Sequence, residues 1–373
     1  MPAPADWALH THFAALPDPR VDRTKRHALL DIVTIAVCAI ICGADSWADV
    51  ERFGQAKLPW LRTFLTLPHG IPSHDTFGRV FAALDPAAFE QCFLGWVQTL
   101  ITRTAGTVVA IDGKTVRRSH DRAANREALH LVSAWATANG VVLGQVATDD
   151  RANEITAIPA LLEVLALTGA IVTIDAMGCQ REIARTILER GADYVLALKD
   201  NQPTLHELVA DHFTLTAGQD PLGHQTITKN HGRLEIRTCH ATDDPAILAW
   251  LDPDGAWPGL RSIAAVEGER RIGETISVER RYYLSSLPAD PKRIGEAVRD
   301  HWGIENGLHW VLDMAFREDE SRVRQGAAAE NLAVLRHMAL NLLRRETTAK
   351  VGIKAKRLMC GWDEGYLTKV LTA

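Results

Sequence analysis

The chain has 373 residues, of which 47% are hydrophobic and 23% charged, and this predicts a globular protein with room for two or three domains. Its net charge of -5 excludes the strongly basic overall composition typical of many nucleic-acid-binding proteins, although local basic faces matter more for a polyanion than the global sum. The most apolar run, Ile32 to Cys42, is too short to cross a bilayer and indicates a buried helix.

The six cysteines are scattered and form no C-x-x-C pair. Since no signal peptide is recognisable, we expect reduced, buried thiols in a cytoplasmic protein without a membrane partner. From Ser321 onward, ten Lys and Arg residues accompany only four acids. This excess indicates either a basic face for a polyanion or an ordinary solvated helix face.

Residues 1–104 are predicted to form a helical first domain. A buried helix is expected from Leu29 to Cys42, and Ser46 with Asp49 three residues later has the form of a capping box. Ser73 is expected to begin a further helix. Several short helices with polar turns suit a helix-turn-helix-like DNA-binding domain, and they suit a plain helical bundle equally well.

Beyond Thr107 the apolar pattern changes to a period of two, which indicates strands. The expected strands cover residues 108–112, 129–137, 141–147, 171–175 and 194–198, and the expected helices cover residues 157–167 and 180–190. Three antiparallel strands followed by alternating helix and strand predict a mixed α/β sheet, in an order that matches the RNase H-like fold. A doubly wound nucleotide-binding fold is the rival, but neither G-x-G-x-x-G nor a P-loop is present.

We therefore interpret residues 105–202 as the first part of an RNase H-like core. Short β-prone stretches then predict a β-rich insertion over residues 203–289. The core is expected to resume in residues 290–345, with a long helix from Lys292 to about Phe316. Residues 346–373 are expected to form a basic C-terminal tail.

Two apolar strands each end on an acid. Asp112 follows the run Val108 to Ile111, and Asp175 follows the run Ile171 to Ile174. An Asp often ends a strand simply because it suits a turn. Two such acids, however, suggest carboxylates that meet at one edge of a sheet, where proteins build sites for hard divalent cations.

A third acid, Glu305, lies in the long helix, with His301 and His309 four residues away on either side. A Glu among apolar neighbours would be costly unless it were paired or bound to metal, so Glu305 is predicted to complete a three-carboxylate site. Gly303 and Gly307 weaken the helix by about 1 kcal/mol each and indicate that another element packs closely against it.

Other interpretations of these residues stay open. His301, Glu305 and His309 could form a zinc site, although they lack the H-E-x-x-H spacing. The competing acids for the third position, which are also expected as helix caps or surface charges, are Glu154, Asp313 and Glu318. Trp302 and Trp310 could stack on an unpaired base, while packing in the core is their more common role.

Several stretches spread along the chain carry a family likeness. They are residues 72–81 (PSHDTFGRVF), 110–114 (AIDGK), 153–155 (NEI), 173–176 (TIDA), 194–202 (YVLALKDNQ), 231–237 (HGRLEIR), 301–310 (HWGIENGLHW) and 316–322 (FREDESR). From about His12 to Arg345 the chain resembles the DDE transposases of bacterial insertion sequences, in the subgroup that includes the H-repeat-associated proteins.

The resemblance implies an RNase H-like catalytic core interrupted by a β-rich insertion, and a helical N-terminal domain that binds transposon ends. The catalytic and metal-binding acids of the family fall on Asp112, Asp175 and Glu305. Two Mg²⁺ ions, or Mn²⁺ in their place, are expected to be held by these acids, by water and by substrate phosphate.

Related transposases carry a Tyr-x2-Arg-x3-Glu-x6-Lys signature around the last acid. Aligned on Glu305, its other positions are Val298, His301 and Leu312, so the Arg and Lys of the signature are absent here. The candidate replacements for their contact with phosphate are His301, Arg317, Arg322 and Arg324. The DNA-binding candidates are Lys114, Arg117, Lys199, His301, Arg322 and Arg324.

The sequence thus predicts a Mg²⁺-dependent DNA transposase that cleaves phosphodiester bonds at element ends and joins the 3′-hydroxyl to target DNA. We expect a homodimer when DNA is bound, and a cytoplasmic, nucleoid-associated location. Two alternatives remain: a catalytically decayed or repurposed DNA-binding protein of the same fold, and a metal-dependent hydrolase of small phosphoesters.

Overall fold

The structure is a computed structural model that describes residues 8–100, 106–120, 127–148, 154–217, 223–230 and 232–373. The boundary expected between residues 104 and 105, and two residues of the family motifs, Asn153 and His231, lie outside the described residues. Of the helices in the described ranges, none has the length and apolar character needed to cross a membrane.

The regular secondary structure of residues 8–100 is helical. The helices are α1 (Ala8–Phe13), the short 3₁₀ turn Asp22–Thr24, α2 (Leu29–Ile41), α3 (Trp47–Ala56), α4 (Leu58–Leu61), α5 (His74–Ala83) and α6 (Pro86–Leu100). The predicted capping box is confirmed, because the Ser46 hydroxyl accepts from the Asp49 amide while the Asp49 carboxylate accepts from the Ser46 amide. Ser73 caps α5, as expected, by accepting from the Thr76 amide.

One nine-stranded sheet crosses the molecule in the order β3-β2-β1-β4-β5-β9-β8-β7-β6. The strands are β1 (Val108–Thr115), β2 (His130–Ala136), β3 (Val141–Thr148), β4 (Ile171–Ile174), β5 (Asp193–Leu198), β6 (His224–Asn230), β7 (Arg233–Thr242), β8 (Ser262–Ile272) and β9 (Thr275–Ser285). β1 runs antiparallel to β2 and parallel to β4, and β5 runs parallel to β4. The expected mixed α/β sheet is therefore present.

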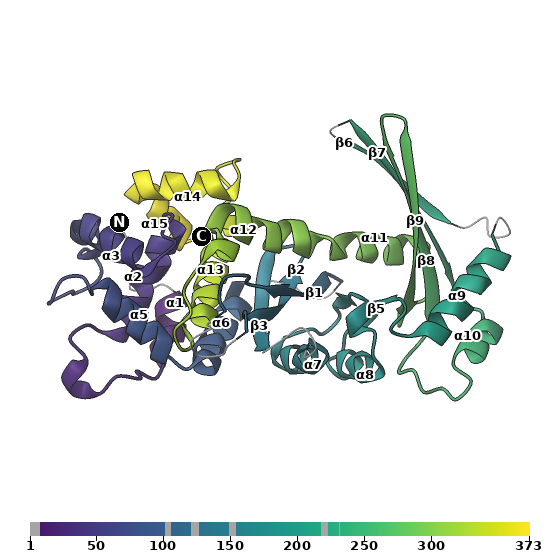
Figure 1. The fold of residues 1–373 in the computed structure, drawn as a ribbon, viewed down its shortest axis with the longest axis horizontal. Coiled ribbons are helices and arrows are strands. Elements are labelled where there is room, and N and C mark those ends of the chain that lie inside the picture. Colours follow the sequence, from purple (N-terminus) through teal and green to yellow (C-terminus); the bar gives the residue numbers. More distant parts are fainter. Residues whose placement is uncertain (1–7, 101–105, 121–126, 149–153, 218–222, 231) are drawn as a thin grey trace.

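The inserted strands do not form a sheet of their own. β9 pairs with β5, from Val195 opposite Ser285 to Leu198 opposite Tyr282, so the strands β6–β9 continue the central sheet. Their far ends extend beyond the rest of the protein, while α9 (Pro203–Leu215) and α10 (Pro245–Leu251) lie near their base (Figure 1). The β-rich insertion thus extends the central sheet beyond β5 by four strands.

Helices cover both faces of the sheet. α7 (Glu154–Val164) and α8 (Arg181–Glu189) lie on one face, and α11 (Pro291–His301) runs across the other (Figure 1). α11 packs Ile294, Ala297 and Val298 against apolar residues of the sheet. The chain then makes a π-helical turn at Glu305–His309 before α12 (Trp310–Phe316), so the predicted long helix is interrupted at the candidate acid.

The C-terminal part folds back onto the first helices. α13 (Ala328–Arg345) packs against α2, α5 and α6, and α14 (Ile353–Trp362) and α15 (Glu364–Leu371) follow it. Arg357 donates hydrogen bonds to the Ile40 and Ala315 carbonyls and lies 4.2 Å from the Phe316 ring centre. The last residues are therefore helical rather than a basic tail, and their buried cations stabilise the packing of this layer.

The two glycines of the predicted long helix pack closely, as expected, Gly307 against Trp135 of β2 and Gly303 against Thr137 directly after it. A Cβ added at Gly303 would lie 2.8 Å from the Thr137 methyl, and one at Gly307 would lie 2.8 Å from a ring carbon of Trp135. This close approach brings the π-helical turn to the sheet.

Gly307→Ala is therefore expected to lower the melting temperature. Overpacking against Trp135 costs about 1–3 kcal/mol, which exceeds the roughly 1 kcal/mol that Ala gains over Gly in a helix. Gly78→Ala in α5 is the matched control, since its Cβ would meet Trp47 at an ordinary 3.4 Å. Thermal unfolding checks both variants, and a Gly307→Ala protein as stable as wild type would contradict the close packing.

Candidate active site

The parallel pairing of β1 and β4 places two acids side by side. Ile111 lies opposite Ile174 in the register, and each is followed directly by an acid, Asp112 or Asp175. The Asp175 carboxylate accepts from the Met177 amide at 3.0 Å and so begins a short 3₁₀ turn. Burial, and then the negative charge of Asp112, raise the pKa of the Asp175 carboxyl above its ordinary value.

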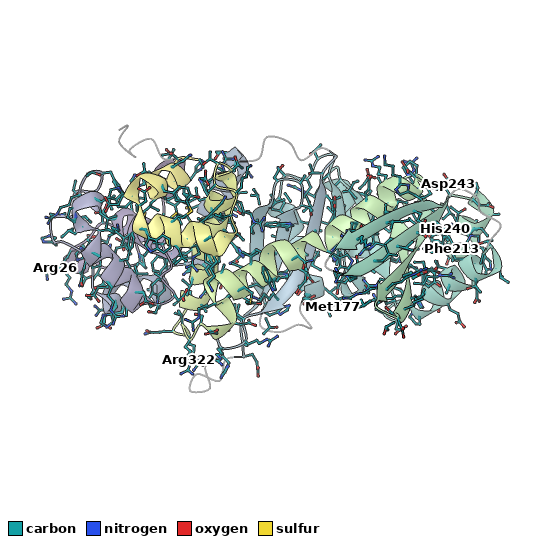
Figure 2. All side chains as sticks on the ribbon, turned by 90° about the horizontal axis from the view of Figure 1, so that it is seen from above. Arg26, Met177, Phe213, His240, Asp243 and Arg322 are labelled. Carbon is teal, nitrogen blue, oxygen red and sulfur yellow. The ribbon has the colours of Figure 1, made fainter. Side chains whose placement is uncertain are left out.

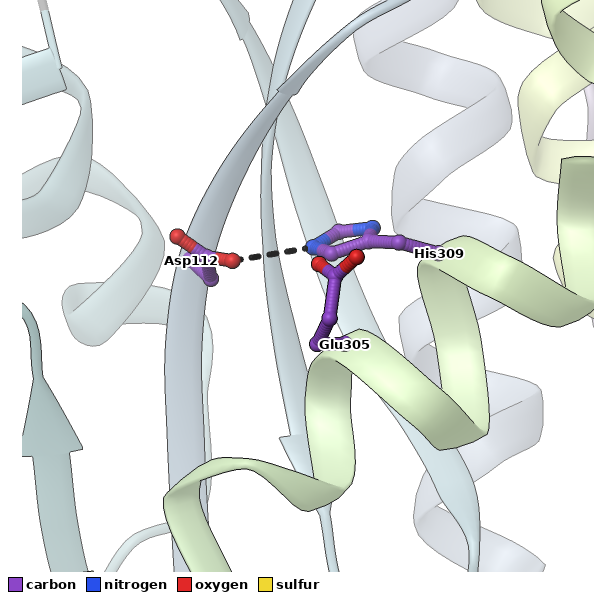
Figure 3. Close-up of side chains that lie close together, drawn as sticks. All are labelled: Asp112, Glu305 and His309. Carbon is purple, nitrogen blue, oxygen red and sulfur yellow. Dashed lines mark ion pairs between the residues drawn. The ribbon is translucent and has the colours of Figure 1, made fainter. Parts of the chain in front are cut away.

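Glu305 reaches the same edge of the sheet from the π-helical turn. Ligand atoms of Asp112, Glu305 and His309 all lie within 4.8 Å of one another (Figure 3). The His309 Nε2 lies 3.3 Å from the Asp112 Oδ2. Burial alone raises the pKa of Asp112, but the neighbouring His309 and His301 outweigh it and lower the pKa below its ordinary value.

Glu305 is not the buried charge that the sequence predicted, because its side chain is exposed. The buried member of the cluster is His309, whose side chain is 6% exposed. Neither of its ring nitrogens has a hydrogen-bond partner among the residues that the structure describes. Two carboxylates and an unpartnered imidazole form a donor set that fits a divalent cation.

Asp175 and His301 lie outside this three-residue cluster. The His301 Nδ1 is 3.0 Å from the Thr173 hydroxyl, so that nitrogen already has a partner. The structure therefore places Asp112, rather than His301, beside Glu305 and His309.

A pocket of about 480 Å³ connects these groups. Asp112, Asp175 and Glu305 all contribute to its lining, together with His301. Its other lining cations are Lys199, at the end of β5, and the β9 residues Arg280 and Arg281. Both arginines are partly neutralised, since Arg280 pairs with Glu267 and Arg281 with Glu279. Lys199 is exposed and lines the pocket, so it suits an anionic group entering the pocket.

Lys114 has carboxylate partners already. Its Nζ lies 2.5 Å from Asp313, 3.0 Å from Glu318 and 3.9 Å from Asp319, and its side chain is only 13% exposed. Burial alone lowers the pKa of the Lys114 ammonium, but the charges of Glu318 and Asp313 outweigh it and raise the pKa. This placement favours a structural role for Lys114 over the expected contact with DNA.

Two of the competing acids, which were predicted to be helix caps or surface charges, are buried. Glu318 is 1% exposed and lies between Lys114 and Arg336. Glu154 is 8% exposed, and its Oε1 is 2.5 Å from the His130 Nε2. No local pattern marks either acid, because each partner comes from a distant part of the chain.

The remaining predicted DNA contacts lie apart from the pocket lining. Arg322 is exposed and projects from the body of the protein (Figure 2). Arg117 pairs with Asp319 at 3.1 Å, and Arg324 donates to the Arg118 carbonyl at 2.8 Å. None of these three residues lines the pocket to which Lys199 and His301 contribute.

The two tryptophans that flank Glu305 are not core residues. Trp302 is 43% exposed and Trp310 is 58% exposed. The Arg281 guanidinium lies 4.7 Å from the centre of the Trp302 ring. The expectation of core packing was therefore wrong for both side chains.

Comparison with known proteins gives two family matches that together cover most of the chain. The family model described as "Transposase DDE domain" matches residues 103–342, and "DDE_Tnp_1-associated" matches residues 10–97.

Two relatives are similar over nearly their whole length. The "Putative transposase YncI" of Escherichia coli O157:H7 is 41% identical over 371 residues, covering 98% of this chain and 95% of the relative. The "H repeat-associated putative transposase YhhI" of Escherichia coli (strain K12) is 38% identical, with 97% of each chain covered.

A solved piggyBac transposase synaptic complex with hairpin DNA is 11% identical, with a TM-score of 0.42 over 98% of this chain and 78% of that chain.

Proposed function

Because this chain belongs to the DDE transposase family and is a DNA transposase related to the H-repeat-associated proteins, we propose that it is catalytically competent. It would cleave phosphodiester bonds at the ends of its element and join the resulting 3′-hydroxyl to target DNA. The observation that carries this proposal is the gathering of Asp112, Asp175 and Glu305 around one pocket.

Divalent metal ions are implied by the family, and we propose Mg²⁺ with Asp112, Asp175 and Glu305 as its holders. When bound, such ions supply Lewis-acid stabilisation of charge on phosphoryl oxygens. Asp112 could share a cation with either Asp175 or Glu305, because Asp175 follows the adjacent strand and Glu305 belongs to the π-helical turn. The Met177 amide holds the Asp175 carboxylate in a fixed orientation.

Lys199 is the residue that we propose for contact with substrate phosphate. It is exposed and lines the same pocket as the acids, where it adds positive charge for an anionic strand. The exposed Arg322 would contact DNA farther from the acids. Lys114 would stabilise β1 through its three carboxylate partners instead of binding DNA.

We further propose that the first five strands, with the order β3-β2-β1-β4-β5, constitute an RNase H-like core. The helices up to Leu100 would bind the ends of the element, and β6–β9 would flank the bound strand. A homodimer on DNA and a location at the nucleoid are part of the same proposal.

The test is a cleavage assay on a plasmid that carries the inverted repeats flanking the gene. With Mg²⁺ we expect strand breaks at the repeat ends, and chelation with EDTA should abolish them because the acids then lack their cations. A plasmid with scrambled repeats is the control. Specific binding of the repeats without any cleavage in Mg²⁺ or Mn²⁺ would instead identify a decayed copy.

A further inference from the structure

His309 is a buried side chain whose only polar contact in the described part of the chain is an ion pair with Asp112, drawn dashed in Figure 3. Neither ring nitrogen has a hydrogen-bond partner in the described part of the chain, although its side chain is 94% removed from solvent. The Nε2 is 3.3 Å from the Asp112 Oδ2, yet this contact lacks hydrogen-bond geometry. A buried polar atom left without a partner destabilises the fold, so one expects another group to bind it.

The geometry around His309 indicates that the group bound there is a cation. The side chains of Asp112, Glu305 and His309 point toward one another (Figure 3), with one ligand atom from each within 4.8 Å of the others. Two ligands of one ion, each about 2.0–2.3 Å from it, can be separated by nearly this distance. One cation can therefore contact all three side chains after a small adjustment.

The local fold holds this arrangement in place. Glu305 and His309 are the first and last residues of the π-helical turn, in which the Trp310 amide donates to the Glu305 carbonyl. Such turns occur frequently at functional sites. Gly307, between them, allows the turn to lie against Trp135, and both side chains face Asp112 within β1, which continues to Thr115.

We propose that His309 is a direct ligand of a divalent ion that Asp112 and Glu305 also hold. This inference rests on the transposase function proposed above. The ion would thus have a nitrogen ligand from His309 in addition to the carboxylate oxygens of the family's acids. Imidazole favours transition metals over Mg²⁺, so His309 would shift the preference of this site toward Mn²⁺.

Mn²⁺ binding to the full-length protein tests this proposal without any activity assay. We expect the electron spin-echo spectrum of bound Mn²⁺ to show nitrogen modulation in wild type and to lose it in His309→Gln. Mn²⁺ affinity in this variant should fall by about tenfold or more. His301→Gln is the matched control, because His301 precedes Glu305 by four residues and lines the same pocket, but bonds to Thr173. It should retain both the modulation and the affinity.

His309→Cys gives an independent result if His309→Gln is unstable. A thiolate in this position should lower the Mn²⁺ affinity and create a Cd²⁺ site with a sulfur charge-transfer absorption, since soft metals prefer thiolate. Circular dichroism checks that each variant is folded.

Nitrogen modulation that persists in His309→Gln, or an unchanged Mn²⁺ affinity in that variant, would overturn the ligand assignment. Mn²⁺ bound to wild type without nitrogen modulation would overturn it too, but would leave the carboxylate site intact. Failure of the proposed function is a separate result, namely absence of cleavage by a wild-type protein that binds Mn²⁺ through His309.

Discussion

Asp112→Asn is expected to reduce cleavage of end-bearing DNA roughly a thousandfold or more, since removing the shared carboxylate forfeits several kcal/mol of transition-state stabilisation. Asp112 lies beside Asp175, which follows the neighbouring strand, and beside Glu305 and His309, which belong to the π-helical turn. Its loss therefore affects every proposed cation contact. Single-turnover cleavage of labelled repeat DNA in Mg²⁺ measures the effect.

The Asn side chain has nearly the same shape as Asp, so the fold and the binding of repeat DNA should persist. Asp254→Asn is the control, because Asp254 is an exposed loop residue outside the pocket. Gel-shift affinity for the repeats separates binding from cleavage. Cleavage by Asp112→Asn at the wild-type rate would refute the assignment of this acid.

Glu318→Gln is expected to lower the free energy of unfolding by roughly 3–5 kcal/mol, the usual cost of removing one partner from a buried ion pair. The Glu318 carboxylate is 1% exposed, and lies 3.0 Å from the Lys114 Nζ and 3.5 Å from the Arg336 guanidinium. Arg336 is buried and the Lys114 side chain is only 13% exposed, so the neutral amide leaves their charges poorly compensated. Urea unfolding at neutral pH measures the difference.

The same acid predicts a dependence of stability on pH. Burial alone raises the pKa of Glu318, but the charges of Lys114 and Arg336 outweigh it and bring the pKa to about 2, against an ordinary 4.5. A lowered pKa in the folded state contributes stability that is complete above the unfolded value and is lost as the pH falls. Wild type should therefore lose this contribution between about pH 4.5 and pH 2.

The difference in unfolding free energy between wild type and Glu318→Gln should accordingly shrink across this acidic range. Glu163→Gln, at an exposed position of α7, is the control and should follow wild type at every pH. A Glu318→Gln protein as stable as wild type at neutral pH would show that the ion pairs of Glu318 with Lys114 and Arg336 do not stabilise the fold.

Much of the fold follows from local pattern. The apolar runs before Asp112 and Asp175 predict strands, and the alternation of strands and helices predicts the mixed sheet. The caps at Ser46 and Ser73 depend on residues three positions apart, so the sequence by itself indicates where α3 and α5 begin. The family likeness rests on motifs of the same kind and agrees with the family matches.

The interactions between distant elements were decided only by the tertiary structure. Lys114 and Glu318 are separated by 204 positions, and no pattern near either residue indicates that they pair. The same holds for His309, which lies beside Asp112 only because the π-helical turn packs against Trp135 on β2.

The sequence therefore determined where the apolar runs and helix caps lie, because hydrophobic period and capping are local properties of the chain, although β1 continues past Asp112 to Thr115. Tertiary structure decided which side chains share an environment. Lys114 has carboxylate partners in place of phosphate, and His309 lies among the acids, because burial and pairing arise only once separate elements pack together.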